Sequence, residues 1–128
     1  MTTIWIDGAS RGNPGPSAVA WVRDDGKRRA HWLTFEGTNN RAEYLALLEA
    51  LHTAVADKLE DVLVLSDSKL VVNQVNGEYA CREPKLKPFL HRAETYIKCI
   101  PKFRINLIPR SENKKADRLC NMALDGKL

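Results

Sequence analysis

The segment that most constrains the fold is Val62-Leu63-Val64-Leu65, four consecutive apolar residues between two stretches of helical character. A continuous apolar run of this kind is typical of a strand in a parallel sheet that helices cover on both faces. The stretch before it, 39–58, places Leu47, Ala50, Leu51 and Ala54 on one helical face. Helices on both sides of this strand require crossover connections, which predicts parallel pairing with later strands.

The other segments complete a mixed sheet. Residues 3–7, 17–24 and 28–36 read as strands, and Asp25-Gly26 is a hairpin turn signal, so these three are expected to form an antiparallel meander. Residues 103–107 alternate as a fifth strand. We predict an α/β fold with a mixed five-stranded sheet flanked by helices, in the order βββαβααβα. Helix starts are expected at Asn39 or Asn40 as N-cap, after a cap at Ser66 or Ser68, within 85–99 where Pro88 interrupts the first turns, and at Ser111.

The composition is that of a soluble globular protein. The chain has 128 residues, 44% of them hydrophobic, which suits a single domain over 1–128. No apolar run approaches the roughly 20 residues of a membrane span, and the N-terminus lacks the basic and apolar segments of a signal peptide. Three widely spaced cysteines indicate neither a disulfide framework nor a zinc site. We therefore expect a cytoplasmic monomer with no membrane partner.

The positive charge is concentrated in one part of the chain. Residues 81–118 contain eleven Lys/Arg and four Asp/Glu, a net charge of +7, whereas the whole chain carries +4 and the remainder therefore −3. A basic region on a small domain favours a polyanionic partner, although a solvated surface would have the same composition.

Four acidic residues stand out by their positions. Asp7 and Asp67 each follow an apolar run, so both are expected at the C-terminal ends of strands, the edge where open α/β sheets bind ligands. Glu43 lies on the apolar face of the first predicted helix, and Asp117 lies on the inward face of the last one. The topology therefore allows the four carboxylates to converge.

Each acid also has an ordinary structural explanation. Asp7 would suit a turn and Asp67 a helix cap. Glu43 would be favourable near a helix N-terminus, and Asp117 could be a surface acid. Taken together, however, converging carboxylates with no Lys or His among them suit Mg²⁺ or Mn²⁺. Two such ions roughly 4 Å apart support phosphoryl transfer, so the residues indicate a nuclease-like site beside a basic substrate surface.

Four segments then show a resemblance to a known family. They are DGASRGNPGP at 7–16, TNNRAEYLALLEAL at 38–51, LSDSKLVVNQVNG at 65–77 and PRSENKKADRL at 109–119. In this order they resemble the signature blocks of the type 1 ribonuclease H family, and the resemblance spans nearly the whole chain. It implies the ribonuclease H-like fold and an endoribonuclease that hydrolyses the RNA strand of RNA–DNA hybrids. It also implies two divalent cations, Mg²⁺ or Mn²⁺, and products with 5′-phosphate and 3′-hydroxyl ends.

The resemblance assigns roles to the four acids. Asp7 matches the carboxylate that bridges both metals. Glu43 and Asp67 match positions that help to hold the metal on the leaving-group side. Asp117 matches the position that helps to hold the metal carrying the attacking water.

The resemblance also implies a substrate-binding set. Backbone groups at Gly8, Ser10 and Gly12 would approach the hybrid, because glycine permits close contact. Glu43 and the backbone near Ser10 match positions that sense the 2′-hydroxyl, which distinguishes RNA from DNA.

Four polar residues extend this set to the DNA strand and to the groove. Asn13 and Thr38 match positions that contact a phosphate of the DNA strand. Asn39 and Asn40 match those that read the minor groove, and either could cap the helix as well.

Three features depart from the family pattern. The loop before Asp117 lacks the histidine of many cellular members, and Arg110 is the nearest candidate substitute. Lys69 stands where better-known bacterial members often have glutamine, and it could still contact the hybrid as a flexible cation. The chain is also short over 77–85, so this is expected to be a compact form without a basic protrusion or a separate hybrid-binding domain.

Two other functions fit the same sequence less well. A catalytically silent domain that only binds nucleic acid would not need all four acids. Another nuclease or strand-transfer enzyme of the superfamily is disfavoured by the TNNRAE block and by the absence of extra domains. A phosphate-binding loop of the Walker type is excluded because GK[ST] does not follow the glycine-rich stretch.

Overall fold

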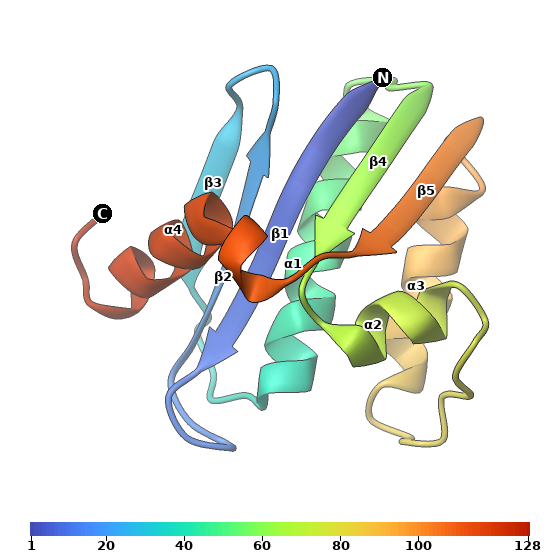
Figure 1. The fold of residues 1–128 in the computed structure, drawn as a ribbon. Coiled ribbons are helices and arrows are strands. Elements are labelled where there is room, and N and C mark those ends of the chain that lie inside the picture. Colours follow the sequence, from blue (N-terminus) through green and yellow to red (C-terminus); the bar gives the residue numbers. More distant parts are fainter.

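A computed structural model describes residues 1–128 as a five-stranded sheet in the order β3-β2-β1-β4-β5. The first three strands form an antiparallel meander, and β4 and β5 continue it in parallel with β1 (Figure 1). The strands are β1 Thr2–Ser10, β2 Ser17–Arg23, β3 Arg28–Trp32, β4 Asp61–Ser66 and β5 Lys102–Leu107. The predicted mixed sheet is therefore confirmed.

Four α-helices flank the sheet, and a short 3₁₀ helix precedes the last one. They are α1 Asn39–Ala56, α2 Lys69–Val75, α3 Lys87–Ile97, the 3₁₀ helix η1 Arg110–Glu112 and α4 Lys114–Leu124. The order of strands and α-helices is the predicted βββαβααβα.

The sheet separates two apolar layers of unequal size. The larger layer joins one face of the sheet to α1, α2 and α3, and includes Ile4, Ile6, Leu47, Leu51 and Val64. The smaller one lies under α4 on the other face and consists of Ala18, Ala20, Cys120, Ala123 and Leu124. Figure 1 shows α1 and α3 behind the sheet and α4 in front of it.

The structure corrects the expectation that β4 is covered on both faces. Val62 and Val64 are fully buried, whereas Leu63 and Leu65 are half-buried. The reason is that α4 packs on β1, β2 and β3 and leaves the front of β4 open. The side of β4 next to the candidate site is therefore accessible.

Several predicted boundaries were wrong for identifiable reasons. β1 does not end at Asp7, because its hairpin with β2 continues to the pair Ser10↔Ser17. β3 ends at Trp32 rather than at residue 36. Thr38, not Asn39 or Asn40, is the N-cap of α1, where its Oγ1 accepts the N–H of Arg41 over 3.2 Å.

The later helices also begin at other residues than expected. Pro88 does not interrupt a helix but occupies the first turn of α3, where a missing N–H costs nothing. Ser111 lies in η1, and α4 begins only at Lys114. No helix combines the length and the apolar character needed to span a membrane.

Candidate active site

The candidate site lies where two neighbouring strands part. β1 and β4 pair from Thr2↔Val62 to Trp5↔Leu65, after which β4 ends while β1 continues alongside β2. Asp7 lies just beyond the last of these pairs, and Asp67 follows the end of β4. The separation of the strands opens a crevice between the two carboxylates, as expected at the carboxyl edge of an α/β sheet.

Glu43 reaches this crevice from the first turns of α1, on the opposite face of the sheet. Side chains alternate along a strand, so Ile4, Ile6 and the position of Gly8 face α1, whereas Asp7 faces the other side. A Cβ built on Gly8 would lie 2.3 Å from the carbonyl carbon of Ala42, so glycine is required for this approach of helix to strand. The amide of Gly8 then donates to Oε1 of Glu43 over 2.6 Å.

Three of the four predicted acids form one tight cluster. Asp7, Glu43 and Asp67 each offer a carboxylate oxygen, and these oxygens all lie within 4.8 Å of one another. Asp117 lies outside this group of three but lines the same open cleft, which has a volume of about 720 Å³. The four acids that the sequence suggested could converge therefore line one cleft, and three of them lie in close contact.

Burial and mutual repulsion make this cluster electrostatically costly without a cation. Burial, with the charges of Asp67 and Asp117, raises the pKa of Asp7 to about 7, although a hydrogen bond with Glu43 opposes part of the rise. Burial also raises the pKa of Glu43 well above its usual value, and the charge of Asp7 adds to it. Such shifts are typical of functional sites.

The donor set fits a hard divalent cation. All ligand atoms on offer are carboxylate oxygens, the kind that Mg²⁺ and Mn²⁺ prefer. A bound cation would favour the ionised carboxylates and so relieve their repulsion.

Asn113 is a buried residue of the site that the sequence analysis did not identify. Its side chain is 1% exposed, and Nδ2 donates to the carbonyl oxygen of Ile6 over 2.8 Å and to Oδ2 of Asp67 over 3.2 Å. An asparagine just before a helix reads as an ordinary cap, so no signal in the sequence distinguishes it.

Seven of the nine predicted substrate residues line two neighbouring cavities. Gly8, Asn39, Asn40, Lys69 and Arg110 line the cleft that contains the four acids. Asn13, Thr38 and Asn40 line a second cavity, bounded also by Arg41 and Lys85. Asn40 is common to both, so the two cavities adjoin at the start of α1.

Ser10 and Gly12 line neither of these cavities. The Ser10 amide donates to Oδ1 of Asn39 over 2.9 Å, and its hydroxyl donates to the carbonyl of Gly37 over 2.7 Å. Gly12 has a φ of 109°, a conformation that glycine adopts without strain. These residues thus shape the loop, and their contact with substrate stays a prediction.

Arg110 stands at the rim of the cleft. Its Nη2 lies 3.5 Å from Oδ1 of Asp117, and its side chain is 79% exposed. An exposed cation beside a carboxylate can exchange that partner for a phosphate at little cost.

A five-stranded sheet in this order, with carboxylates where β1 and β4 separate, is typical of the ribonuclease H-like class of proteins. A family model described as reverse transcriptase-like matches residues 6–123. The chain is 39% identical over 128 residues to ribonuclease HI of Halobacterium salinarum, covering 94% of this chain and 63% of that protein. The chain belongs to the type 1 ribonuclease H family.

Solved structures agree with this assignment. The crystal structure of RNase H1 from Halobacterium salinarum superposes with a TM-score of 0.92 at 38% identity, covering 98% of each chain. LC11-RNase H1, solved in complex with an RNA/DNA hybrid, gives a TM-score of 0.90 at 35% identity, again covering 98% of each chain. The ribonuclease H-like fold is therefore confirmed.

Proposed function

We propose that this protein is an endoribonuclease that hydrolyses the RNA strand of RNA–DNA hybrids with two divalent cations. The observation that carries the proposal is the cluster of Asp7, Glu43 and Asp67, whose oxygens lie within 4.8 Å of one another in an open cleft. The family membership and the hybrid bound to LC11-RNase H1 support the choice of substrate.

The four acids would share the cations as the family resemblance implies. Asp7, Glu43 and Asp67 would hold one, and Asp7 and Asp117 would hold the other. When bound, two divalent cations, Mg²⁺ or Mn²⁺, supply activation of the attacking water and stabilisation of the leaving oxygen. Attack on the phosphorus with departure of the 3′ oxygen gives the 5′-phosphate and 3′-hydroxyl ends.

The chain's own groups position the acids and the substrate. The Gly8 amide donates to Oε1 of Glu43 and so fixes the position of this carboxylate. Asn39 and Asn40 line the cleft at the start of α1, where they would contact the bases of the hybrid. Thr38 and Asn13, in the adjoining cavity, would hold a phosphate of the DNA strand.

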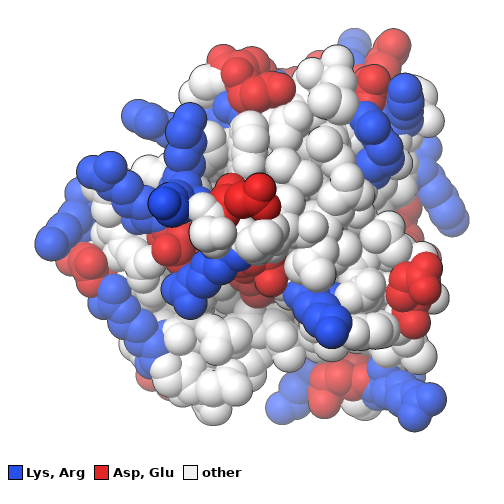
Figure 2. Space-filling model, viewed as in Figure 1, with Lys and Arg blue, Asp and Glu red and all other residues white.

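Basic side chains would hold the backbone of the hybrid. Figure 2 shows Lys and Arg side chains gathered over α4, beside the cleft. Lys69 and Arg110 line the cleft itself. Because these side chains are long and exposed, they would contribute affinity more than strand selectivity.

One assay tests the proposal. Labelled RNA–DNA hybrid, RNA duplex and DNA duplex are each incubated with Mg²⁺, Mn²⁺ or chelator, and the ends of the products are analysed. We expect cleavage of RNA in the hybrid alone, only with metal, leaving 5′-phosphates. Cleavage that continues undiminished in chelator, or binding of hybrid without any cleavage, would overturn the proposal.

A matched pair of variants locates the activity. Asp67→Asn should abolish cleavage, because Asp67 belongs to the cluster. Asp61→Asn, at the other end of β4, removes the same charge from an exposed ion pair with Arg104 and should leave cleavage unchanged.

We also propose a cellular location and an oligomeric state. A cytoplasmic monomer is what the sequence predicts, and light scattering together with cell fractionation would check both properties.

A further inference from the structure

Asn113 joins the segments that carry three of the four acids. Its Nδ2 donates one hydrogen bond to the carbonyl of Ile6, the residue before Asp7, and another to Oδ2 of Asp67. Its own carbonyl accepts the amide of Asp117 over 3.0 Å, in the first turn of α4. The partners lie 107, 46 and four residues away in the sequence.

The usual role of an asparagine at this position does not explain these contacts. Asn113 is the N-cap of α4, but its side chain makes no capping hydrogen bond. Its Oδ1, the atom that would accept a helix amide, is buried and has no partner. Turning the amide over would place Oδ1 against two other acceptors, so the donors must face Ile6 and Asp67.

The chemistry of an amide suits support of a metal ligand. It donates two hydrogen bonds yet carries no charge, so it fixes a carboxylate without competing with a cation for its negative charge. Because Oδ2 of Asp67 is held by Nδ2, the other oxygen of Asp67 is left to coordinate. A lysine in this place would neutralise the cluster instead.

We propose that Asn113 is a positioning residue that sets the metal affinity and turnover of the site by orienting Asp67. This proposal rests on the proposed function. Loss of a residue that hydrogen-bonds a metal ligand typically costs about 10- to 100-fold in metal affinity or activity. The unpaired Oδ1 is a cost to folding, which is consistent with selection for the site rather than for stability.

The test uses two substitutions and a control. Asn113→Ala removes the side chain, and Asn113→Leu keeps nearly the same shape while removing every polar atom. Asn76→Ala is the matched control, since its Nδ2 also donates to a strand carbonyl, that of Ile105 over 3.1 Å, but no acid of the cluster is involved.

Two measurements separate positioning from folding. The first is the Mg²⁺ concentration that gives half of the maximal rise in melting temperature. The second is the pair of steady-state constants kcat and KM for cleavage of a hybrid. Both Asn113 variants should need about tenfold more Mg²⁺ or greater, and lose about 10- to 100-fold in kcat, with KM changed less than about twofold. Asn76→Ala should melt lower but keep the wild-type Mg²⁺ midpoint and kcat.

The outcomes are distinguishable. If either folded Asn113 variant keeps the wild-type Mg²⁺ midpoint and kcat, the residue is merely structural and the proposal falls. If both variants fail to fold while Asn76→Ala folds, the contacts serve the fold and the proposal falls as well. If the wild type binds Mg²⁺ but cuts no hybrid, the proposed function is wrong, whereas the Mg²⁺ midpoints still decide the role of Asn113.

Discussion

The amide of Gly8 donates to Oε1 of Glu43 over 2.6 Å, although the two residues belong to a strand and a helix 35 positions apart. A side chain at position 8 would collide with the backbone carbonyl of Ala42, so α1 could not come this close to β1. Glycine therefore allows an acid on one face of the sheet to join an acid on the other.

The first prediction concerns this space. In Gly8→Ala the new methyl group would meet the backbone of Ala42, which cannot move without shifting α1. We expect the free energy of unfolding to fall by about 1–3 kcal/mol, as for other overpacked sites, and cleavage to be lost as Glu43 is displaced. Urea denaturation and a cleavage assay would measure both effects. Gly37→Ala is the control, because a Cβ there meets only ordinary contacts; equal stability of both variants would contradict the packing argument.

The second prediction concerns Asp7. In chelator, Asp7→Asn should melt at a higher temperature than the wild type, because it removes a buried charge that repels Asp67 and Asp117. It should also abolish cleavage, and Mg²⁺ should stabilise it less than the wild type. If Asp7 only formed a turn, asparagine would serve nearly as well, so retained cleavage with an unchanged melting temperature would refute the assignment.

The third prediction is a pH dependence of the metal-free protein. The pKa of Asp7 is raised to about 7 from a usual 3.8, so the folded state binds this proton more tightly than the unfolded state. The contribution of Asp7 to the free energy of unfolding is therefore greatest below about pH 4. It is lost as pH rises through about 7, and amounts to up to about 4 kcal/mol. Asp25 and Asp57 have lowered pKa values, so they stabilise the fold when ionised. Their contribution to stability is lost only at a more acidic pH, as they become protonated, and does not oppose the effect of Asp7 near pH 7.

Melting curves in chelator from pH 5 to pH 8 would measure this effect. The melting temperature of the wild type should fall across the range, and that of Asp7→Asn should fall less. The stabilisation by Mg²⁺ should grow with pH, because the cation binds ionised carboxylates. A wild-type curve that is flat in chelator would contradict the electrostatic account.

The fourth prediction concerns the basic surface. If lysines near the cleft neutralise phosphates, log affinity for hybrid should fall linearly with log salt, by about 0.9 per phosphate on the scale of B-DNA. Replacing Lys85, Lys87 and Lys114 by alanine should flatten this slope and leave single-turnover cleavage at saturation nearly unchanged.

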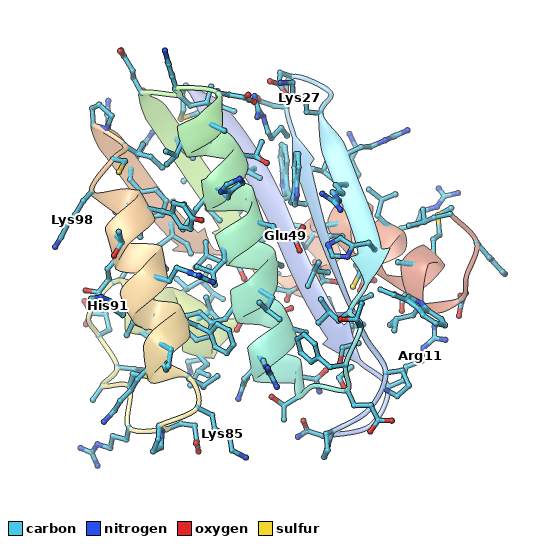
Figure 3. All side chains as sticks on the ribbon, turned by 180° about the vertical axis from the view of Figure 1, so that it is seen from behind. Arg11, Lys27, Glu49, Lys85, His91 and Lys98 are labelled. Carbon is cyan, nitrogen blue, oxygen red and sulfur yellow. The ribbon has the colours of Figure 1, made fainter.

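The control for this experiment removes equal charge from other parts of the surface. Figure 3 shows Lys27 at one end of the protein, Lys85 at the other and Lys98 at one side. A triple variant of Lys27, Lys98 and Lys102 should keep the wild-type salt slope. Equal slopes for both triple variants would place the binding surface elsewhere.

The fifth prediction concerns Arg110, the candidate substitute for the histidine that is missing from the loop before Asp117. Its ion pair with Asp117 is exposed, and contacts of this kind are worth about 1 kcal/mol or less, so Arg110→Ala should slow multiple turnover by about two- to fivefold. Arg118→Ala, also on the basic surface, is the control. A wild-type turnover rate in Arg110→Ala would show that the enzyme works without such a helper.

The sequence predicted the elements well because their apolar patterns are local. Leu47, Leu51 and Glu43 share one face of α1, and all three are buried as that pattern requires. The convergence of Asp7 and Asp67 likewise followed from their positions after two apolar runs, because ligands bind at the carboxyl ends of the strands in an α/β sheet.

What the sequence did not reveal depends on contacts between distant segments. The extension of β1 to Ser10 comes from its pairing with β2, not from its own residues. The open face of β4 results from where η1 places α4. The role of Asn113 depends on partners 107 and 46 positions away, and that of Gly8 on the backbone of Ala42.

The position of α4 has a consequence for how the protein is made. β1 leaves the ribosome before the other strands of this sheet, whereas α4, which packs on it and carries Asp117, follows all of them in the sequence. At about 5–20 residues per second, the 107 positions from Ile6 to Asn113 take several seconds or more to synthesise. Throughout that time the growing chain contains Asp7 without Asp117, so the set of four acids stays incomplete until α4 has been synthesised.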